Sequence, residues 1–233
     1  MFNFFINYNS DGNYYFLTKD GCISIAILLV IVMAAAAFLF NHKQNAKIST
    51  KQLVFSAVSV ATAFALSYIK IIQLPWGGSA TLCSMLFVCL AGYYYGPKMG
   101  LMAAFSYGLL QLLQDGGSYI IHPFQICCDY VFSFMALGLS GFFSKKKHGL
   151  VLGYIAGIIG RLVFLSLGGY IFWMSYMPKD FPASLSAVYP IVYNGSFILT
   201  EGILTIAVLL IPTVNKGLSY IRKLATSESF TLY

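Results

Sequence analysis

Apolar residues occupy most of this chain in long stretches that are separated by short polar gaps. A helix needs roughly twenty apolar residues to cross the hydrocarbon core of a bilayer. Seven stretches meet or approach this length, and they predict membrane-spanning helices at about residues 22–41, 52–71, 80–95, 99–114, 124–143, 149–173 and 190–214. The pattern is typical of an all-α integral membrane protein.

Composition supports a membrane protein over a soluble one. Hydrophobic residues make up 59% of the chain and charged residues only 9%, whereas soluble domains carry roughly 25% charged residues. The net charge of +7 comes from residues in the gaps between apolar stretches, which form no basic patch with interleaved aromatics. A nucleic-acid partner is therefore not expected, and membrane lipid is.

The distribution of lysine and arginine predicts an orientation, because cytoplasmic loops retain basic residues. With the N-terminus outside, ten of the fourteen basic residues lie inside: Lys43, Lys47, Lys51, Lys98, Lys145, Lys146, Lys147, Lys216, Arg222 and Lys223. Lys19, Lys70 and Lys179 lie outside, and Arg161 falls within a span. The bias holds at every loop, so we expect seven spans in a bacterial cell membrane.

Three connections on the predicted outer side differ from the short, basic inner ones. They read "QLPWGGS", "DGGSYIIHP" and "SYMPKDFPASLSAVY", and they are rich in polar, aromatic and glycine residues. Non-helical backbone at membrane depth is tolerated only where it lines a cavity or is buried in protein. We therefore expect a binding site that faces outward.

Ionisable residues inside spans are costly and are functional hypotheses by default. Asp129 lies near the outer end of its span, where a carboxylate could pair with a cationic ligand or accept from an amine. The alternative is an intramembrane ion pair with Arg161, for which we favour an orienting or structural role. Glu201 has no assignable partner, and its role stays open.

Aromatic side chains gather in the outer halves of the spans and in the outer loops. Rings there can stack on a flat heterocycle and attract a cation, although each alone could also be an ordinary membrane-interface residue. Asn194 adds an amide that can read the edge of a nitrogen heterocycle. The rings concerned belong to Trp76, Tyr107, Tyr119, Tyr130, Trp173, Tyr189 and Tyr193.

Two rows of small residues recur at four-residue spacing, which lets another helix approach closely. For Gly149, Gly153 and Gly157 we favour packing within the bundle. The second row, Ala57, Ala61 and Ala65, follows a basic inner loop, where a partner protein could reach it. No P-loop, metal-ligand set or nucleophile with a base occurs, so neither an enzyme nor a self-contained pump is expected, and no cofactor or metal.

Several motifs together resemble the thiamine-specific S component, the substrate-binding subunit of energy-coupling factor (ECF) transporters. The similarity covers about residues 51–216 and rests on the order of "LPWGGSATL", "YYGPKMG", "HPFQICCDYVFSFMALGLSGFF", "GYIFWMSYMPK" and "YNGS". The resemblance implies a six-helix bundle that binds the vitamin near its outer face. It also implies a transmembrane coupling protein and two ATPase subunits as partners, docking at the Ala57, Ala61 and Ala65 row.

The resemblance also implies roles for individual residues. Asp129 takes the place of the family's ligand-binding carboxylate, and Tyr130 follows it as in the family. Trp173 matches a stacking aromatic, and Tyr189 with Asn194 matches the pair that reads the aminopyrimidine. Tyr107 and Tyr119 match further aromatic positions, and Trp76 lies in the first-loop region of the site.

Two features depart from the family pattern. Leu165 stands where the pattern carries a histidine near the thiazolium, so a related pyrimidine or vitamin precursor is an alternative ligand. The span at 22–41 is additional to the six-helix core. We therefore expect an extension over residues 1–50 with one extra transmembrane helix and a basic inner loop, a binding domain over 51–216, and a cytoplasmic tail over 217–233. A membrane enzyme and a membrane protein without ligand are the remaining alternatives.

Overall fold

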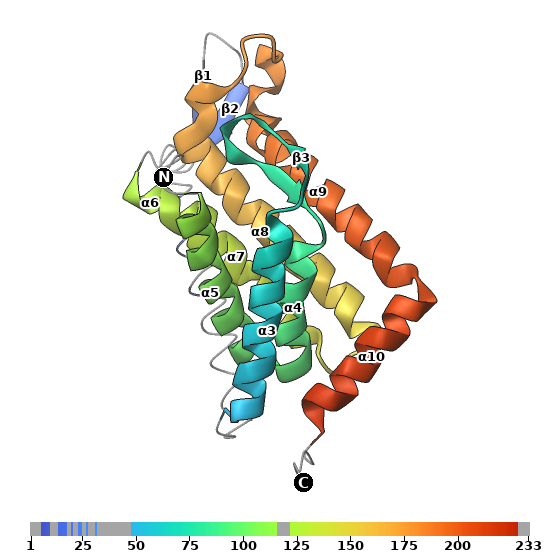
Figure 1. Cartoon of the computed structure of the whole chain (residues 1–233). Coiled ribbons are helices and arrows are strands. Elements are labelled where there is room, and N and C mark those ends of the chain that lie inside the picture. Colours follow the sequence, from blue (N-terminus) through green and yellow to red (C-terminus); the bar gives the residue numbers. More distant parts are fainter. Residues whose placement is uncertain are drawn as a thin grey trace.

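The computed structural model describes residues 6–9, 14–17, 20, 23, 24, 27, 31, 48–115 and 122–227, without the side chains of β1, β2, Trp76 and Pro123. Most of the predicted span at 22–41 and all of Tyr119 lie outside these residues. Near the N-terminus, strands β1 (Ile6–Asn9) and β2 (Tyr14–Leu17) pair in antiparallel fashion. The rest of the described chain is a bundle of helices (Figure 1).

The first three helices of the bundle follow the hydropathy pattern. Helix α3 (Thr50–Ser67) begins at a capping box, in which Ser49 and Gln52 satisfy each other's backbone N–H groups. Helices α4 (Ser84–Tyr95) and α5 (Pro97–Gln114) are separated only by Gly96, which has a φ of 90°. A proline after this glycine starts α5, because its ring favours the first helical position.

The predicted span at 124–143 is one continuous helical segment of changing pitch. It consists of α6 (Pro123–Ile126), a π-helical stretch η2 (Cys127–Phe132), α7 (Ser133–Met135) and a 3-10 stretch η3 (Ala136–Phe143). The next span is α8 (Gly149–Gly168), which continues as a second π-helical stretch, η4 (Gly169–Trp173), and the short η5 (Met174–Tyr176). A 3-10 turn, η6 (Ala183–Val188), leads into α9 (Tyr189–Leu210).

The six predicted spans of the binding domain are therefore helical, and the all-α membrane fold is confirmed. Four helical segments are long and apolar enough to cross a bilayer: 50–67, 124–143, 149–176 and 183–210. Helix α4 is apolar but shorter. The number of crossings and the orientation of the chain stay predictions.

Three boundaries differ from the prediction by about four residues. One is the start of α4, at Ser84 and not at residue 80, because Ser79–Thr81 form a strand. The first bundle helix ends at Ser67 and not at residue 71, because strand β3 (Lys70–Gln73) turns back through η1 (Pro75–Gly77) and pairs with β4 (Ser79–Thr81). The last predicted span, α9, ends at Leu210 and not at residue 214. Ile211 is extended before Pro212, as residues before proline usually are. A further helix, α10 (Pro212–Thr226), follows, so the expected tail begins inside a helix.

Helix α4 lies at the centre of the bundle, with nine of its twelve residues buried. The glycine row of α8 packs against η3, as the interpretation of that row predicted. A methyl group at Gly153 would lie 2.9 Å from the Ser140 backbone, and one at Gly157 would lie 3.1 Å from Leu137 Cα. The α3 row differs, since Ala57, Ala61 and Ala65 are all exposed.

Candidate functional site

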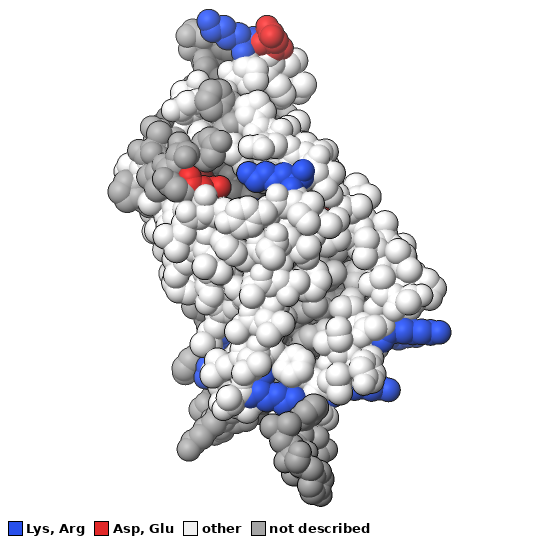
Figure 2. Space-filling model, in the orientation of Figure 1, with Lys and Arg blue, Asp and Glu red and all other residues white. Residues whose placement is uncertain are grey.

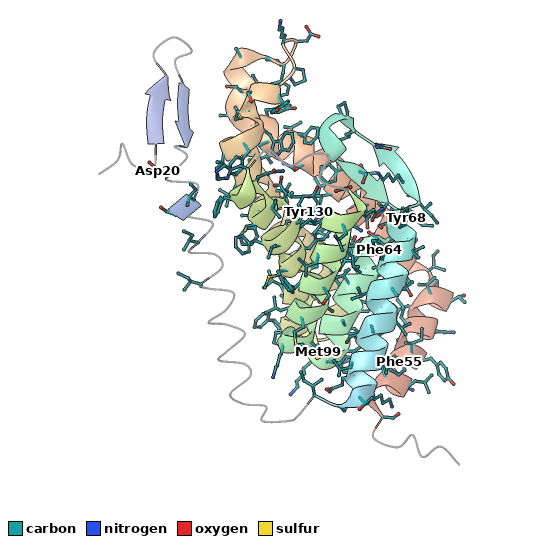
Figure 3. The ribbon with its side chains drawn as sticks, turned by 60° about the vertical axis from the view of Figure 1, so that its left-hand side comes forward. Asp20, Phe55, Phe64, Tyr68, Met99 and Tyr130 are labelled. Carbon is teal, nitrogen blue, oxygen red and sulfur yellow. The ribbon has the colours of Figure 1, made fainter. Side chains whose placement is uncertain are left out.

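A pocket opens at the end of the bundle where the β3–β4 hairpin lies, remote from α10 (Figure 1). Tyr130 is at this end, and Met99 is at the other (Figure 3). The walls come from the ends of α3 and α5, the hairpin, the segment from α6 to α7, the segment from α8 to η5, and the start of α9. The lining residues are Ser67, Lys70, Gly77, Gly78, Ser79, Gln111, Gln114, Asp115, Gln125, Asp129, Tyr130, Phe134, Arg161, Leu165, Gly169, Trp173, Tyr176, Tyr189, Pro190, Tyr193, Asn194 and Phe197.

The Asp129 carboxylate has a defined position in one wall of the pocket. Its Oδ2 accepts a hydrogen bond from Gln125 Nε2 at 2.8 Å and another from Trp173 Nε1 at 3.2 Å. Gly168 makes room for the group, because a methyl there would lie 2.6 Å from Oδ1. Carboxylates hold such positions best when their oxygens are hydrogen-bonded.

Both partners of this contact sit on π-helical stretches. Asp129 lies in η2 and Trp173 ends η4. A π-helical turn adds one residue to an α-helix, shifts the side chains that follow, and is common at functional sites. Hydropathy predicts that these segments are helical, but it carries no signal for the extra residue in each turn.

Helix α9 contributes an amide to the pocket. The Asn194 side chain is buried, and its Nδ2 donates to Pro190 O at 2.8 Å and to Leu165 O at 3.3 Å. Among the described residues its Oδ1 accepts no hydrogen bond, so this oxygen is available to a donor in the pocket. Tyr189, the first residue of α9, is also buried and lines the pocket.

Another part of the wall is polar, and apart from Tyr130 its residues were not singled out in the sequence analysis. Tyr130 donates its hydroxyl to Asp115 Oδ2 at 2.8 Å. Gln114 Oε1 accepts from Ser67 Oγ at 2.9 Å and from Gln111 Nε2 at 3.0 Å. The two glutamines at the end of an apolar helix were the available signal, since polar residues are rare inside membranes.

Arg161 also lines the pocket, but it does not pair with Asp129. Within the described chain no ion pair joins these two residues, so the ion-pair alternative for Asp129 is wrong. The guanidinium instead lies 4.0 Å from the centre of the Phe134 ring, and its buried Nε has no hydrogen-bond partner. A buried cation over an aromatic face gains from the ring quadrupole.

Three of the predicted aromatic residues remain to be placed. Tyr107 is buried behind the wall, with its ring 5.1 Å from that of Phe134, which lines the pocket. Trp76 lies in η1, but its side chain is outside the described structure, as is the whole of Tyr119. No three histidine, cysteine, aspartate or glutamate residues gather as metal ligands in the part of the chain that is described.

Glu201 does not line the pocket and lies one turn along α9 from Phe197, which does. It is 3% exposed, and its two carboxylate oxygens accept four hydrogen bonds from the segment that connects β4 to α4. The sequence offered no partner for this residue, because its four donors are two hydroxyls and two backbone N–H groups. Such donors, unlike a lysine, leave no recognisable pattern.

Comparisons with known proteins place the chain in a family. The sequence profile of the thiamine transporter protein family (Thia_YuaJ) matches residues 53–220. The thiamine transporter ThiT of Bacillus subtilis (strain 168) is 28% identical over 173 residues, which are 68% of this chain and 88% of that protein.

A solved structure of ThiT from Listeria monocytogenes has the same fold. Its TM-score is 0.55 at 24% identity, and the match covers 70% of this chain and 96% of that one. The profile match starts near the beginning of α3 and ends within α10, so it takes in every helix that contributes to the pocket. Since it spans well over half of the residues, the chain belongs to the thiamine transporter protein family.

Proposed function

We propose that this chain is the thiamine-binding S component of an ECF transporter, which captures the vitamin from outside the cell. The observation that carries the proposal is the Asp129 carboxylate, held by Gln125 and Trp173 in a pocket with aromatic walls. Thiamine combines a cationic thiazolium ring with an aminopyrimidine. It therefore needs a negative charge, flat apolar surfaces and a hydrogen-bonding edge in one site.

The pocket offers each of these groups. Asp129 supplies the charge, which acts strongly because little water screens it there. Trp173 presents an indole ring on which a heterocycle can stack, with Tyr189 and Tyr130 on other parts of the wall. Asn194 Oδ1 accepts no hydrogen bond from the described residues and can accept from the exocyclic amine of the pyrimidine.

A close relative of thiamine is the second candidate ligand. Leu165, which replaces the histidine of the family pattern, lines the pocket and is 9% exposed. An aliphatic side chain there removes a polar partner that the thiazolium end of the ligand would otherwise meet. A pyrimidine or vitamin precursor without the charged ring would lose less from this change than thiamine does.

The transport step belongs to partner subunits in this proposal. The sequence carries no P-loop, so ATP hydrolysis falls to two ATPases that act through a transmembrane coupling protein. Helix α3 supports docking, because Ala57, Ala61 and Ala65 are exposed together on one face. Small exposed side chains allow a helix of another protein to approach closely.

Ligand binding to the purified protein tests the proposal. The chain has two tryptophans, and Trp173 lines the pocket, so thiamine should quench the fluorescence in a saturable way. Asp129→Asn removes the charge but keeps the shape, and it should weaken binding at least about a hundredfold, or about 2.7 kcal/mol. Asp180→Asn, the same change in an exposed loop carboxylate, should bind like the wild type.

The ligand panel decides between the two candidates. Thiamine, an aminopyrimidine precursor and a thiazole precursor are titrated under the same conditions, and mass spectrometry identifies whatever remains bound after mild purification. A pyrimidine that binds more tightly than thiamine would assign the site to the alternative ligand. If no member of the panel binds, the proposed function is refuted.

A further inference from the structure

Glu201 is a buried carboxylate inside a membrane helix, and it does not line the pocket. It lies in the middle of α9, where a carboxylate is expensive unless it is fully hydrogen-bonded. Within the described chain no basic side chain pairs with it. The hydrogen bonds that it accepts all come from uncharged donors in one short segment, and its charge also interacts with that of the buried Arg161 at longer range.

The four hydrogen bonds lock that segment in place. Oε2 accepts from the backbone N–H of Thr81 at 3.0 Å and from its hydroxyl at 2.7 Å. Oε1 accepts from the backbone N–H of Met85 at 2.9 Å and from the Ser84 hydroxyl at 3.2 Å. Cys83 between them has a φ of 58°, a conformation that non-glycine residues adopt only when their surroundings impose it.

The locked segment is the base of the hairpin that forms part of the pocket wall. Thr81 is the last residue of β4 and pairs with Lys70 at the start of β3. The turn of the same hairpin carries Gly77, Gly78 and Ser79, which line the pocket. The position of the turn over the pocket therefore depends on how its base is held.

The turn itself is also attached to α9. Tyr193 donates its hydroxyl to Pro75 O and accepts from Gly78 N at 3.3 Å. Gly78 packs so closely on Phe197 that a methyl there would lie 2.8 Å from the ring. Tyr193, Phe197 and Glu201 follow at four-residue spacing, so they form one stripe along α9.

We propose that Glu201 is a positioning residue for the ligand pocket. By fixing the hairpin base to the helix that carries Asn194, it sets the distance between the hairpin turn and the opposite pocket wall. The carboxylate suits this task better than an amide, because both of its oxygens accept hydrogen bonds and all four groups around it are donors. The part that concerns ligand affinity rests on the proposed function.

Glu201→Gln is the direct test. The glutamine keeps the size of the side chain, but its NH₂ group faces two donors and cannot accept from them. We expect hydrogen exchange of the amides in residues 70–85 to rise at least about tenfold, while exchange in α8 stays unchanged. We also expect thiamine to dissociate at least about tenfold faster, with a smaller change in its association rate.

Thr200→Val is the matched control. Thr200 directly precedes Glu201 on α9, and its hydroxyl donates to Ser196 O of the same helix. This variant removes a polar group beside Glu201 but none of the four donors to the carboxylate. It should therefore match the wild type in hairpin exchange and in thiamine dissociation.

Two further measurements keep the test decisive. If Glu201→Gln does not fold, Thr81→Val removes one of the four donors and should raise hairpin exchange by a smaller factor. Hairpin exchange needs no ligand, so it decides the positioning role even if the wild type binds no thiamine, a result that refutes only the proposed function. Unchanged hairpin exchange in folded Glu201→Gln would overturn the inference.

Discussion

At the scale of single residues, the geometry around Asp129 depends on the absence of a side chain at Gly168. A methyl group there would lie 2.6 Å from Asp129 Oδ1 and 3.2 Å from Cys128 Cβ. Real Cβ atoms do not approach an oxygen so closely, so the carboxylate has to move. Its hydrogen bonds with Gln125 and Trp173 then lose their geometry.

Gly168→Ala should therefore weaken thiamine binding at least about tenfold, or about 1.4 kcal/mol, in a calorimetric titration. Gly195→Ala is the control, because a methyl at Gly195 would meet only Leu199 Cδ1, at 3.7 Å. Both changes add the same methyl group to a helix. Equal affinity in the two variants would show that the position of the Asp129 carboxylate does not determine binding.

Trp173 makes two separable contributions, a ring for stacking and an N–H donor to Asp129 Oδ2. Trp173→Phe keeps an aromatic face but removes the donor, and hydrogen bonds to charged groups are worth about 1.5–3 kcal/mol. We expect affinity to fall about tenfold or more with phenylalanine, and further with leucine, when binding is measured by calorimetry. Identical affinities for the phenylalanine variant and the wild type would exclude a role for the hydrogen bond.

Residue chemistry in the sequence predicted part of this site. A carboxylate near the end of an apolar stretch is rare enough to be noticed, and Asp129 does line the pocket. Gln125 lies one turn before Asp129 and donates a hydrogen bond to its carboxylate. A neutral amide in an apolar stretch is a weaker signal, so the sequence did not point to it. The four donors around Glu201 were not predictable, because they include backbone N–H groups that every residue carries.

At the scale of elements, the row of glycines in α8 makes a testable contact. Gly153 faces the backbone of Ser140 in η3, and a methyl group would lie 2.9 Å from both its Cα and its carbonyl oxygen. Backbone atoms inside a packed bundle cannot shift as a flexible side chain can. The helices would have to separate over the length of the contact.

Gly153→Ala should lower the free energy of unfolding by about 1–3 kcal/mol, as overpacking usually does. Thermal unfolding in detergent measures this change. Gly217→Ala in α10 is the control, since nothing lies within 4 Å of the added methyl, and alanine in a helix is favoured over glycine by roughly 0.5–1 kcal/mol. A Gly153 variant as stable as the wild type would contradict close packing of the row.

Some elements could not be predicted by hydropathy, for identifiable reasons. Helix α10 carries Lys216, Arg222 and Lys223 among polar residues, so a search for long apolar stretches does not detect it. Arg222 nevertheless holds it to the bundle by donating to Tyr93 Oη at 2.7 Å and to Ser144 O at 2.6 Å. The β3–β4 hairpin was hidden because its first strand, with three isoleucines nearby, continues the apolar pattern of α3.

At the scale of the whole molecule, the pocket and most of the described basic residues lie at opposite ends. Basic side chains gather around the lower end of the bundle, near the start of α3 and along α10 (Figure 2). The hairpin lies at the other end (Figure 1), and residues of its turn line the pocket. This polarity agrees with the prediction that the ligand enters from outside, because basic residues favour the cytoplasmic side.

A binding subunit that transports only with partners should be separable into two functions by mutation. Helix α3 contributes only Ser67, at its end, to the pocket, whereas Ala57 and Ala61 are exposed near the middle of the helix. Ala61→Leu fills the small-residue face without touching a pocket residue. We expect unchanged thiamine affinity in the purified variant and a loss of thiamine uptake when the coupling protein and the ATPases are present.

Ser106→Leu is the appropriate comparison, because Ser106 is exposed on α5 and is also small. It adds a similar volume to another lipid-facing surface, and uptake should continue at the wild-type rate. Normal uptake with Ala61→Leu would exclude the alanine row as the docking surface and direct the search to other exposed faces. Loss of binding together with uptake would instead show that α3 transmits changes to the pocket, since Ser67 at its end lines the wall.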